Sequence, residues 1–97
     1  MTGGWTLAVL DSEWHPRLLL PITSDWLGVM QQLIRSEGDW IALLQRRPTT
    51  VSAMPSPKDI QLTRDLYRQL RPLDMRLADH LITAGKDRFS FRAAGLL

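Results

Sequence analysis

The sequence contains no cysteine and only two histidines among its 97 residues. The lack of cysteine excludes a disulfide framework and a thiolate zinc site, and it makes the cytoplasm the expected compartment. No stretch approaches the roughly 18 consecutive apolar residues of a membrane span, and the first residues lack the basic segment of a signal peptide. G-x-S-x-G and GK[ST] motifs are also missing, which removes two common routes to hydrolytic and phosphate chemistry.

The composition is that of a globular protein, with 44% hydrophobic and 23% charged residues. This length is enough for one compact domain, so we expect residues 1–97 to form a single domain. The charges are distributed unevenly: residues 1–45 carry a net charge of −3 and residues 46–97 a net charge of +5. The basic second half predicts a surface for nucleic acid or an acidic partner, or else an ordinary solvated helix face.

The hydrophobic pattern predicts a mixed α/β fold with about five strands packed by two main helices, in two or three layers. Ser24 can cap the first helix, with Trp26, Val29, Met30 and Leu33 on one face, and Ser56 can cap the second. Pro21 requires an edge position or a strand end. The expected strands are 5–10, 17–22, 40–44, 75–83 and 88–92, the helices run from about 25 to 38 and from 57 to about 71, and a turn spans 84–87.

The second helix has two contrasting faces. One side is expected to be apolar and to pack on the sheet, and the opposite side carries a row of arginines that we single out as a possible nucleic-acid or partner contact. The apolar set is Ile60, Leu62, Leu66, Tyr67 and Leu70, and the arginines are Arg64, Arg68 and Arg71.

Four landmarks in the second half of the chain resemble the ending of RadC-like proteins of the JAMM (MPN) metalloprotease superfamily. They are Pro55-Ser56-Pro57-Lys58-Asp59-Ile60 with Leu62-Thr63, then Asp79-His80-Leu81-Ile82, then Phe89-Ser90-Phe91, and finally Gly95-Leu96-Leu97. The resemblance implies a JAMM/MPN, cytidine-deaminase-like architecture. It also implies a zinc ion held by His-x-His, an Asp and a water, with a Glu as acid/base and a Ser assisting the oxyanion.

This sequence departs from that pattern at the positions of the metal ligands. The strand 40–44 runs into Gln45-Arg46-Arg47-Pro48, so the resemblance places Gln45 and Arg47 at the histidine positions. A register shifted by one residue places Arg46 and Pro48 there instead, again without a histidine. Because arginine is permanently protonated and offers no lone pair, it repels a zinc ion. The expected acid is not evident near the first strand, where Gly3, Gly4 and Trp5 stand.

Ser56 and Asp59 are the remnants of the motif, and they allow two interpretations. Together they form a capping-box pattern at a helix start, which is a structural role. Alternatively they retain a functional role. Asp59 falls within the apolar arc of its helix, so Arg46 or Arg47 would be its natural partner. We therefore hypothesise that an Arg–Asp pair replaces the metal.

The remaining chemistry-bearing residues are scattered. His15 is expected in an exposed turn and His80 in the sheet or core. Trp14, also in a turn, is the tryptophan we expect to meet a partner. The resulting hypothesis is a catalytically inactive RadC-like domain without cofactor, which binds a protein, a second copy or DNA, as in the family's DNA-repair association. The alternative is a divergent zinc metallopeptidase or isopeptidase that recruits ligands from His80, Asp79, Asp59 or a partner chain.

Overall fold

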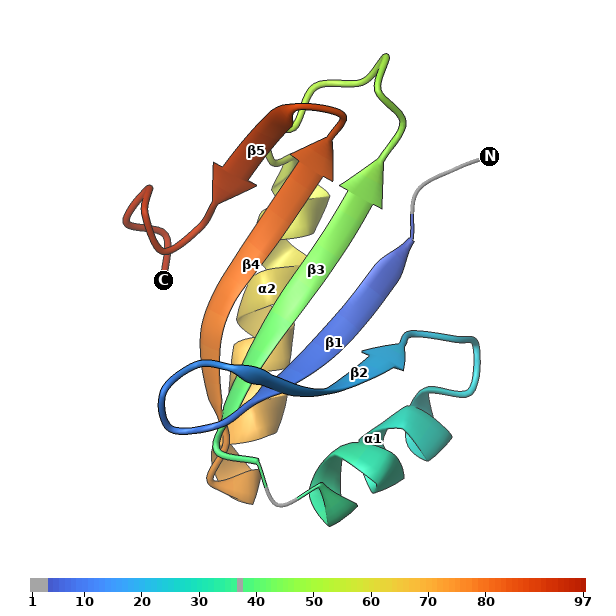
Figure 1. Ribbon diagram of the computed structural model, residues 1–97, viewed down its shortest axis with the longest axis vertical. Helices are drawn as coiled ribbons and strands as arrows, with labels where there is room; N and C mark the ends of the chain where they lie inside the picture. Colours follow the sequence, from blue (N-terminus) through green and yellow to red (C-terminus); the bar gives the residue numbers. More distant parts are fainter. Residues whose placement is uncertain (1–3, 37) are drawn as a thin grey trace.

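The structure is a computed structural model, and it describes residues 4–36 and 38–97. The chain forms a mixed five-stranded sheet with two main helices, as the sequence predicts (Figure 1). The strand order is β2-β1-β3-β4-β5. In that sheet β3 and β4 are parallel, and the other neighbouring pairs are antiparallel. The elements are β1 Trp5–Leu10, β2 Pro16–Pro21, α1 Trp26–Arg35, β3 Trp40–Arg47, α2 Pro57–Leu70, a 3₁₀ turn Arg71–Leu73, β4 Arg76–Ala84 and β5 Asp87–Ser90.

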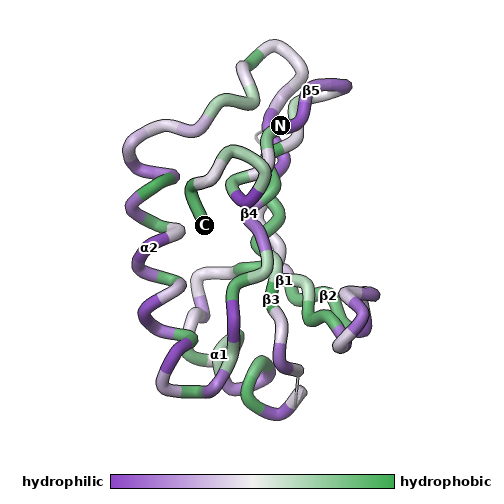
Figure 2. The backbone as a smooth tube through the Cα atoms, turned by 90° about the vertical axis from the view of Figure 1, so that its left-hand side faces the viewer, coloured by the Kyte–Doolittle hydropathy of each residue, from purple (hydrophilic) through white to green (hydrophobic). Residues whose placement is uncertain are grey.

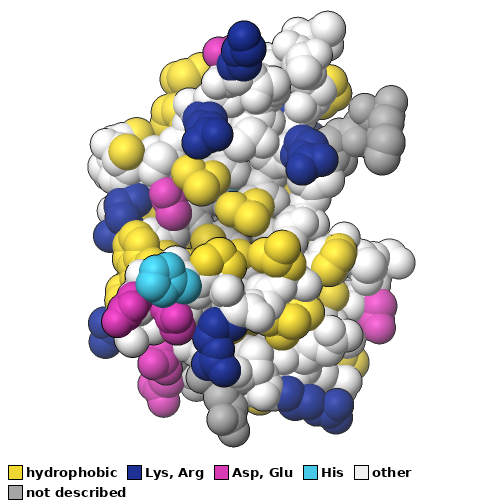
Figure 3. All heavy atoms as spheres, in the orientation of Figure 1, with side chains coloured by type: hydrophobic (Ala, Val, Ile, Leu, Met, Phe, Trp, Pro, Cys, Tyr) yellow, Lys and Arg dark blue, Asp and Glu magenta, His cyan; other side chains and the backbone are white. Residues whose placement is uncertain are grey.

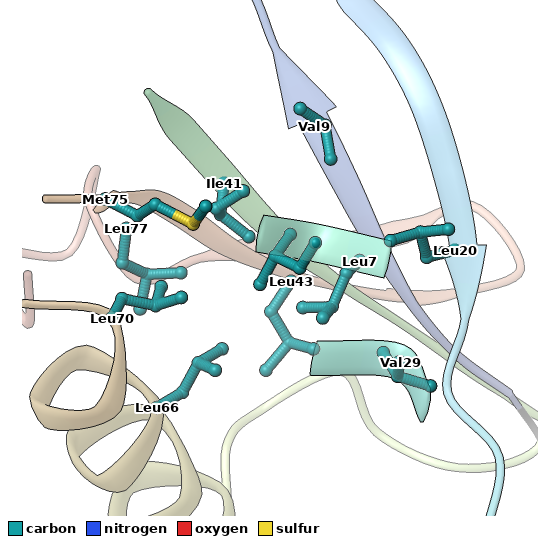
Figure 4. Close-up of a cluster of buried hydrophobic side chains, with 11 residues drawn as sticks. Leu7, Val9, Leu20, Val29, Ile41, Leu43, Leu66, Leu70, Met75 and Leu77 are labelled. Carbon is teal, nitrogen blue, oxygen red and sulfur yellow. The ribbon is translucent and has the colours of Figure 1, made fainter. Parts of the chain in front are cut away.

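Both helices pack on the same face of the sheet, so the domain has two layers. Alternate residues of β1 and β3 point to this face and meet Val29 and Leu33 from α1 and Leu66 and Leu70 from α2. Figure 4 shows these side chains converging between the helices and the strands. Such burial of apolar side chains is the main source of the domain's stability.

Neither helix of the described residues covers the opposite face of the sheet. Small residues line its centre, and the turn between β1 and β2 folds across one end (Figure 1). Trp14 in this turn has a positive φ of 67° and packs against Trp40, with the ring centroids 5.2 Å apart. Figure 3 shows hydrophobic side chains across the middle of this face, with a histidine and several acidic and basic side chains below them.

A bulge in β4 decides which side chains reach the helical layer. The pairing with β3 shifts by one residue, from Ile41 with Leu77 to Ala42 with Asp79. The extra residue, Ala78, reverses the alternation beyond it. As a result Leu77 and His80 both lie buried on the side of α2, whereas Asp79 points to the other side.

Several details of the two helices correct the sequence expectations. Asp25 rather than Ser24 caps α1 through its side chain, because the helix begins one residue later than expected. Trp26 is 36% exposed, and Leu62 and Tyr67 on α2 are 41% and 46% exposed. The buried residues of α2 are Asp59, Thr63, Leu66 and Leu70. The face of α2 that packs on the sheet therefore includes two polar residues, Asp59 and Thr63, which have hydrogen-bond partners on the strands.

The element ends differ slightly from the prediction. Helix α2 stops at Leu70, and Arg71 begins a 3₁₀ turn because Pro72 cannot continue the helix. Strand β3 is longer than expected and runs on to Arg47, while β5 ends at Ser90. Gly85 in the β4–β5 turn has a φ of 62°, which suits glycine. Within the described residues, no helix is long and apolar enough to cross a membrane.

Candidate functional site

The remnants of the expected metal motif meet where β3 ends and α2 begins. Because β3 continues to Arg47, its last three residues alternate between the two faces of the sheet. Gln45 and Arg47 point towards α2 and contact Asp59, whereas Arg46 is exposed on the other face. This alternation favours the register with Gln45 and Arg47 at the histidine positions over the one with Arg46 and Pro48.

Asp59 is the centre of the site and is only 6% exposed. Its Oδ2 atom accepts hydrogen bonds from the Ser56 backbone N–H at 2.7 Å and from the Ser56 hydroxyl at 2.9 Å, and it forms an ion pair with Arg47 Nη2. The Ser56 Oγ in turn accepts from the Asp59 N–H at 3.2 Å, which completes the capping box. The expected Arg–Asp pair is thus confirmed, with Arg47 as the partner.

Arg47 also holds the loop that joins β3 to α2. Its Nη1 donates to the carbonyl oxygens of Ser52 at 2.9 Å and Met54 at 2.7 Å. One guanidinium therefore fixes both the loop and the first turn of α2. A charge-assisted set of this kind is stronger and more directional than neutral hydrogen bonds.

The surroundings of Asp59 act on its pKa in opposite directions. Burial raises the pKa, while the backbone and side-chain hydrogen bonds from Ser56 and the positive charge of Arg47 lower it. The lowering contributions win, so the pKa of Asp59 lies below its usual 3.8 and the carboxylate is charged at neutral pH.

A buried hydrogen-bond chain extends from Asp59 into the sheet. The Gln45 amide donates to Asp59 Oδ1 at 3.4 Å, and its oxygen lies 3.1 Å from His80 Nε2. His80 Nδ1 lies 2.5 Å from the hydroxyl of Thr63, which is also 3.0 Å from the Asp59 carbonyl oxygen. With its amide nitrogen directed at Asp59, Gln45 presents an acceptor to His80. The Nε2 atom therefore carries the proton, and the single proton of the Thr63 hydroxyl is shared between His80 Nδ1 and the Asp59 carbonyl oxygen.

His80 is completely buried, stacking on Phe91 with ring centroids 4.2 Å apart and lying 5.8 Å from the Trp5 ring. Burial lowers the pKa of His80 to about 4, against the opposing negative charges of Asp59 and Asp79. The imidazole is therefore neutral at neutral pH. It serves as a core residue with two hydrogen bonds, one at each ring nitrogen.

These residues do not fit a zinc ion. A catalytic zinc site needs three side chains with free lone pairs and an open fourth position. Arg47 offers no lone pair, its charge already neutralises Asp59, and the Gln45 oxygen faces His80. In the described part of the chain, every buried side-chain polar atom has a partner, and no group of three His, Cys, Asp or Glu could hold a metal.

The structure does not gather the alternative ligands either. Asp79 points away from the network and accepts from the Ser90 hydroxyl at 2.6 Å and the Arg92 N–H at 3.1 Å, which anchors the C-terminal turn. His15 is exposed and lies 3.6 Å from carboxylate oxygens of Asp11 and Glu13, in the turn where the sequence placed it. Near the first strand, Gly4 is exposed, and Gly3 lies outside the described residues.

Thr63 and the Gln45–His80 link are the members of the site that sequence reasoning missed. The signal for Thr63 was its position four residues after Asp59, one helical turn along the same face. No local signal marked the meeting of Gln45 and His80, because it depends on the parallel pairing of β3 with β4 and on the bulge at Ala78.

The three arginines singled out on the second helix are all exposed. Arg64 and Arg68 line one cleft, of about 370 Å³, and Arg71 lines a second, of about 770 Å³. Arg68 lies 4.0 Å from Asp65, an exposed pair that contributes little to stability. These arginines are therefore separate from the buried network at the start of the same helix.

Comparison with known proteins identifies the family. The family model of the RadC-like JAB domain matches residues 23–96. A UPF0758 protein of Chloroflexus aggregans is 35% identical over 68 residues, covering 70% of this chain and 29% of that protein. A UPF0758 protein of Cupriavidus taiwanensis is 39% identical over 59 residues, covering 61% of this chain and 25% of that protein. The chain thus spans less than a third of the length of these relatives, and it belongs to the RadC-like JAB domain family.

Proposed function

We propose that this chain is a catalytically inactive RadC-like JAB domain that acts as a binding or regulatory module. One observation carries the proposal: the guanidinium of Arg47 lies on the carboxylate of Asp59, at the position where the family resemblance implies a metal. A permanent cation there supplies the positive charge that would otherwise come from zinc, but it cannot activate water.

The rest of the network supports the same interpretation. The Ser56 hydroxyl, which the resemblance assigns to oxyanion stabilisation, is engaged in the capping box with Asp59. The buried His80 is held between Gln45 and Thr63. A catalytic group must be free to exchange partners during a reaction, whereas these groups form closed pairs that stabilise one conformation.

The partner of such a module would be a protein, a second copy of the chain or DNA. The exposed arginines of α2 favour an anionic partner. The rival proposal, a divergent zinc metallopeptidase, requires ligands that Gln45 and Arg47 do not supply.

Calorimetric titration with Zn²⁺ after dialysis distinguishes the two. The native chain should bind zinc no more tightly than about millimolar, a free energy of only about −4 kcal/mol. Stoichiometric binding at micromolar zinc or below would contradict the proposal and lead directly to peptidase assays.

Two variants make this titration decisive. The double variant Gln45→His/Arg47→His places two imidazoles on one face of β3 beside Asp59, and it should gain zinc binding at this position. The single variant His15→Gln removes the exposed histidine near Asp11 and Glu13, so any weak zinc signal that disappears in it belongs to the surface.

A further inference from the structure

Two adjacent clefts lie along one flank of α2, between the helix and the C-terminal segment of the chain. Figure 2 shows this segment running between α2 and β4. The first cleft is lined by Arg64 and Arg68, the second by Arg71, Arg76 and Arg92, and the two share the side chain of Tyr67. The clefts therefore form one continuous surface with an aromatic ring at its middle.

The charge of this surface is largely unneutralised. Of these five arginines, Arg68 is the one that forms an ion pair with another described residue. Its contact with Asp65 is long and exposed to solvent. Of the described residues that line the clefts, Asp74 alone is acidic. Arg64 and Arg71 are seven residues apart, so the row along α2 is about 10 Å long. An extended anion can contact several of these guanidinium groups at once.

Aromatic rings accompany the arginines. The guanidinium carbon of Arg71 lies 6.0 Å from the Tyr67 ring, that of Arg76 lies 5.5 Å from the Trp40 ring, and that of Arg92 lies 5.3 Å from the Trp14 ring. Tyr67 and Trp14 remain 46% and 41% exposed. Arg92 donates to the carbonyl oxygens of Ala78 and Leu77, so it anchors the C-terminal turn. At Arg71 and Arg76, a guanidinium near a ring keeps its N–H edge available for a phosphate, while an exposed ring offers a face for a base.

We infer that this surface binds a single strand of nucleic acid, with phosphates on Arg64, Arg71 and Arg76 and a base on Tyr67. The inference rests on the proposed function in taking the domain as a binding module. Basic grooves interleaved with aromatic side chains are the usual means of binding single strands, because unpaired bases expose their faces. A duplex hides its base faces, and a purely acidic peptide gains nothing from the rings.

Fluorescence anisotropy with a labelled 12-nucleotide oligothymidine tests the inference, with a duplex of equal length and polyglutamate as competitors. We expect the single strand to bind at 50 mM salt and to weaken steeply as salt increases. The duplex and polyglutamate should compete at least about tenfold less well. Absence of binding at low salt would overturn the inference, and so would a preference for the duplex or equal competition by polyglutamate.

Substitutions locate the site. Arg71→Gln/Arg76→Gln should weaken binding at least tenfold and reduce the slope of log affinity against log salt by about 1.4, which is 0.7 for each lost phosphate contact. The charge-matched control Arg17→Gln/Arg35→Gln, at exposed positions outside the clefts, should change affinity less than about threefold. Equal losses in both double variants would show general attraction to a basic protein and would overturn the inference.

Tyr67 separates stacking from charge. Tyr67→Ala should weaken oligothymidine binding about tenfold without changing the salt slope, whereas Tyr67→Phe should stay within about twofold of the native chain. Thermal unfolding of each variant establishes that it is folded. An unchanged affinity in Tyr67→Ala would overturn the stacking role. Failure of all oligonucleotide binding with zinc still absent would leave the proposed function intact, whereas tight zinc would overturn that function whatever the oligonucleotide result.

Discussion

The two ends of α2 use arginine in opposite ways. At the start of the helix, the partly buried Arg47 forms an ion pair with the buried Asp59 and donates to two loop carbonyls, so its charge is balanced within the fold. Towards the other end, Arg64, Arg71 and Arg76 are exposed and form no ion pair with the described residues. Arginine therefore stabilises the fold in one region and is free to contact a partner in the other. The difference is whether its charge is paired with a buried carboxylate.

This contrast has an energetic consequence. A buried charged pair is costly to form but far more costly to break on one side, because the remaining charge is left in an apolar setting. Exposed charges remain hydrated whether or not a neighbour is present. Changes at the buried network should therefore alter stability, and changes at the exposed arginines should alter binding.

The largest effect is expected from Asp59→Ala. The substitution leaves Arg47 without its counter-charge and Gln45 without its acceptor, and it removes half of the capping box. We expect the free energy of unfolding in urea to fall by about 3–5 kcal/mol.

The matched control is Asp65→Ala, an exposed carboxylate six residues later on the same helix, which should change stability by less than about 0.5 kcal/mol. A loss within that limit for Asp59→Ala would refute the structural role of the ion pair. The double variant Arg47→Met/Asp59→Leu should lose less than the sum of its single substitutions, by about 1–3 kcal/mol, because neither charge is left alone.

The next effect concerns pH and the other end of the buried chain. The pKa of His80 is about 4 in the folded protein and 6.5 as its ordinary value. Between these values the unfolded chain binds a proton that the folded chain does not, so stability should fall as the pH falls from 6.5 to 4. The loss of folding free energy caused by His80 reaches at most about 3 kcal/mol at pH 4.

Urea unfolding at several pH values measures this slope. The variant His80→Gln should lose most of this pH dependence of stability, however stable it is at neutral pH. The variant His15→Gln, at the exposed turn, should retain the pH dependence. Asp59 acts in a separate range: its lowered pKa gives stability that is lost only as the pH falls below about 3.8. An unchanged slope in His80→Gln would show that the imidazole is not held neutral in the core.

Much of the fold was predictable because it follows from local patterns. The Ser56–Asp59 capping box marked the start of α2, and the short apolar runs marked the strands. The absence of histidine at Gln45 and Arg47, the positions where the resemblance places histidines, was visible in the sequence. Arg47 was expected as one of two partners for Asp59 because Asp59 falls on the inward side of its helix.

What could not be predicted depends on pairing between distant segments. The bulge at Ala78 brings His80 to Gln45, 35 residues away, and no local pattern announces it. Leu62 and Tyr67 were placed on the buried side because hydrophobicity alone was counted, whereas the inward face is centred on Asp59 and Thr63, which satisfy their hydrogen bonds there. Arg76 and Arg92 were not grouped with Arg71 because β4 and the C-terminal turn reach that cleft only in three dimensions.

The smallest effect should come from the exposed arginines, and it completes the comparison. Arg71→Gln/Arg76→Gln removes two positive charges that have no acidic partner among the described residues, so the free energy of unfolding should change by less than about 0.5 kcal/mol. Urea unfolding at low and high salt measures this change, and high salt should reduce it further. A loss above about 2 kcal/mol would mean that these guanidinium groups brace the fold as Arg47 does. The exposed arginines would then stabilise the fold, as Arg47 does, and would not be reserved for binding a partner.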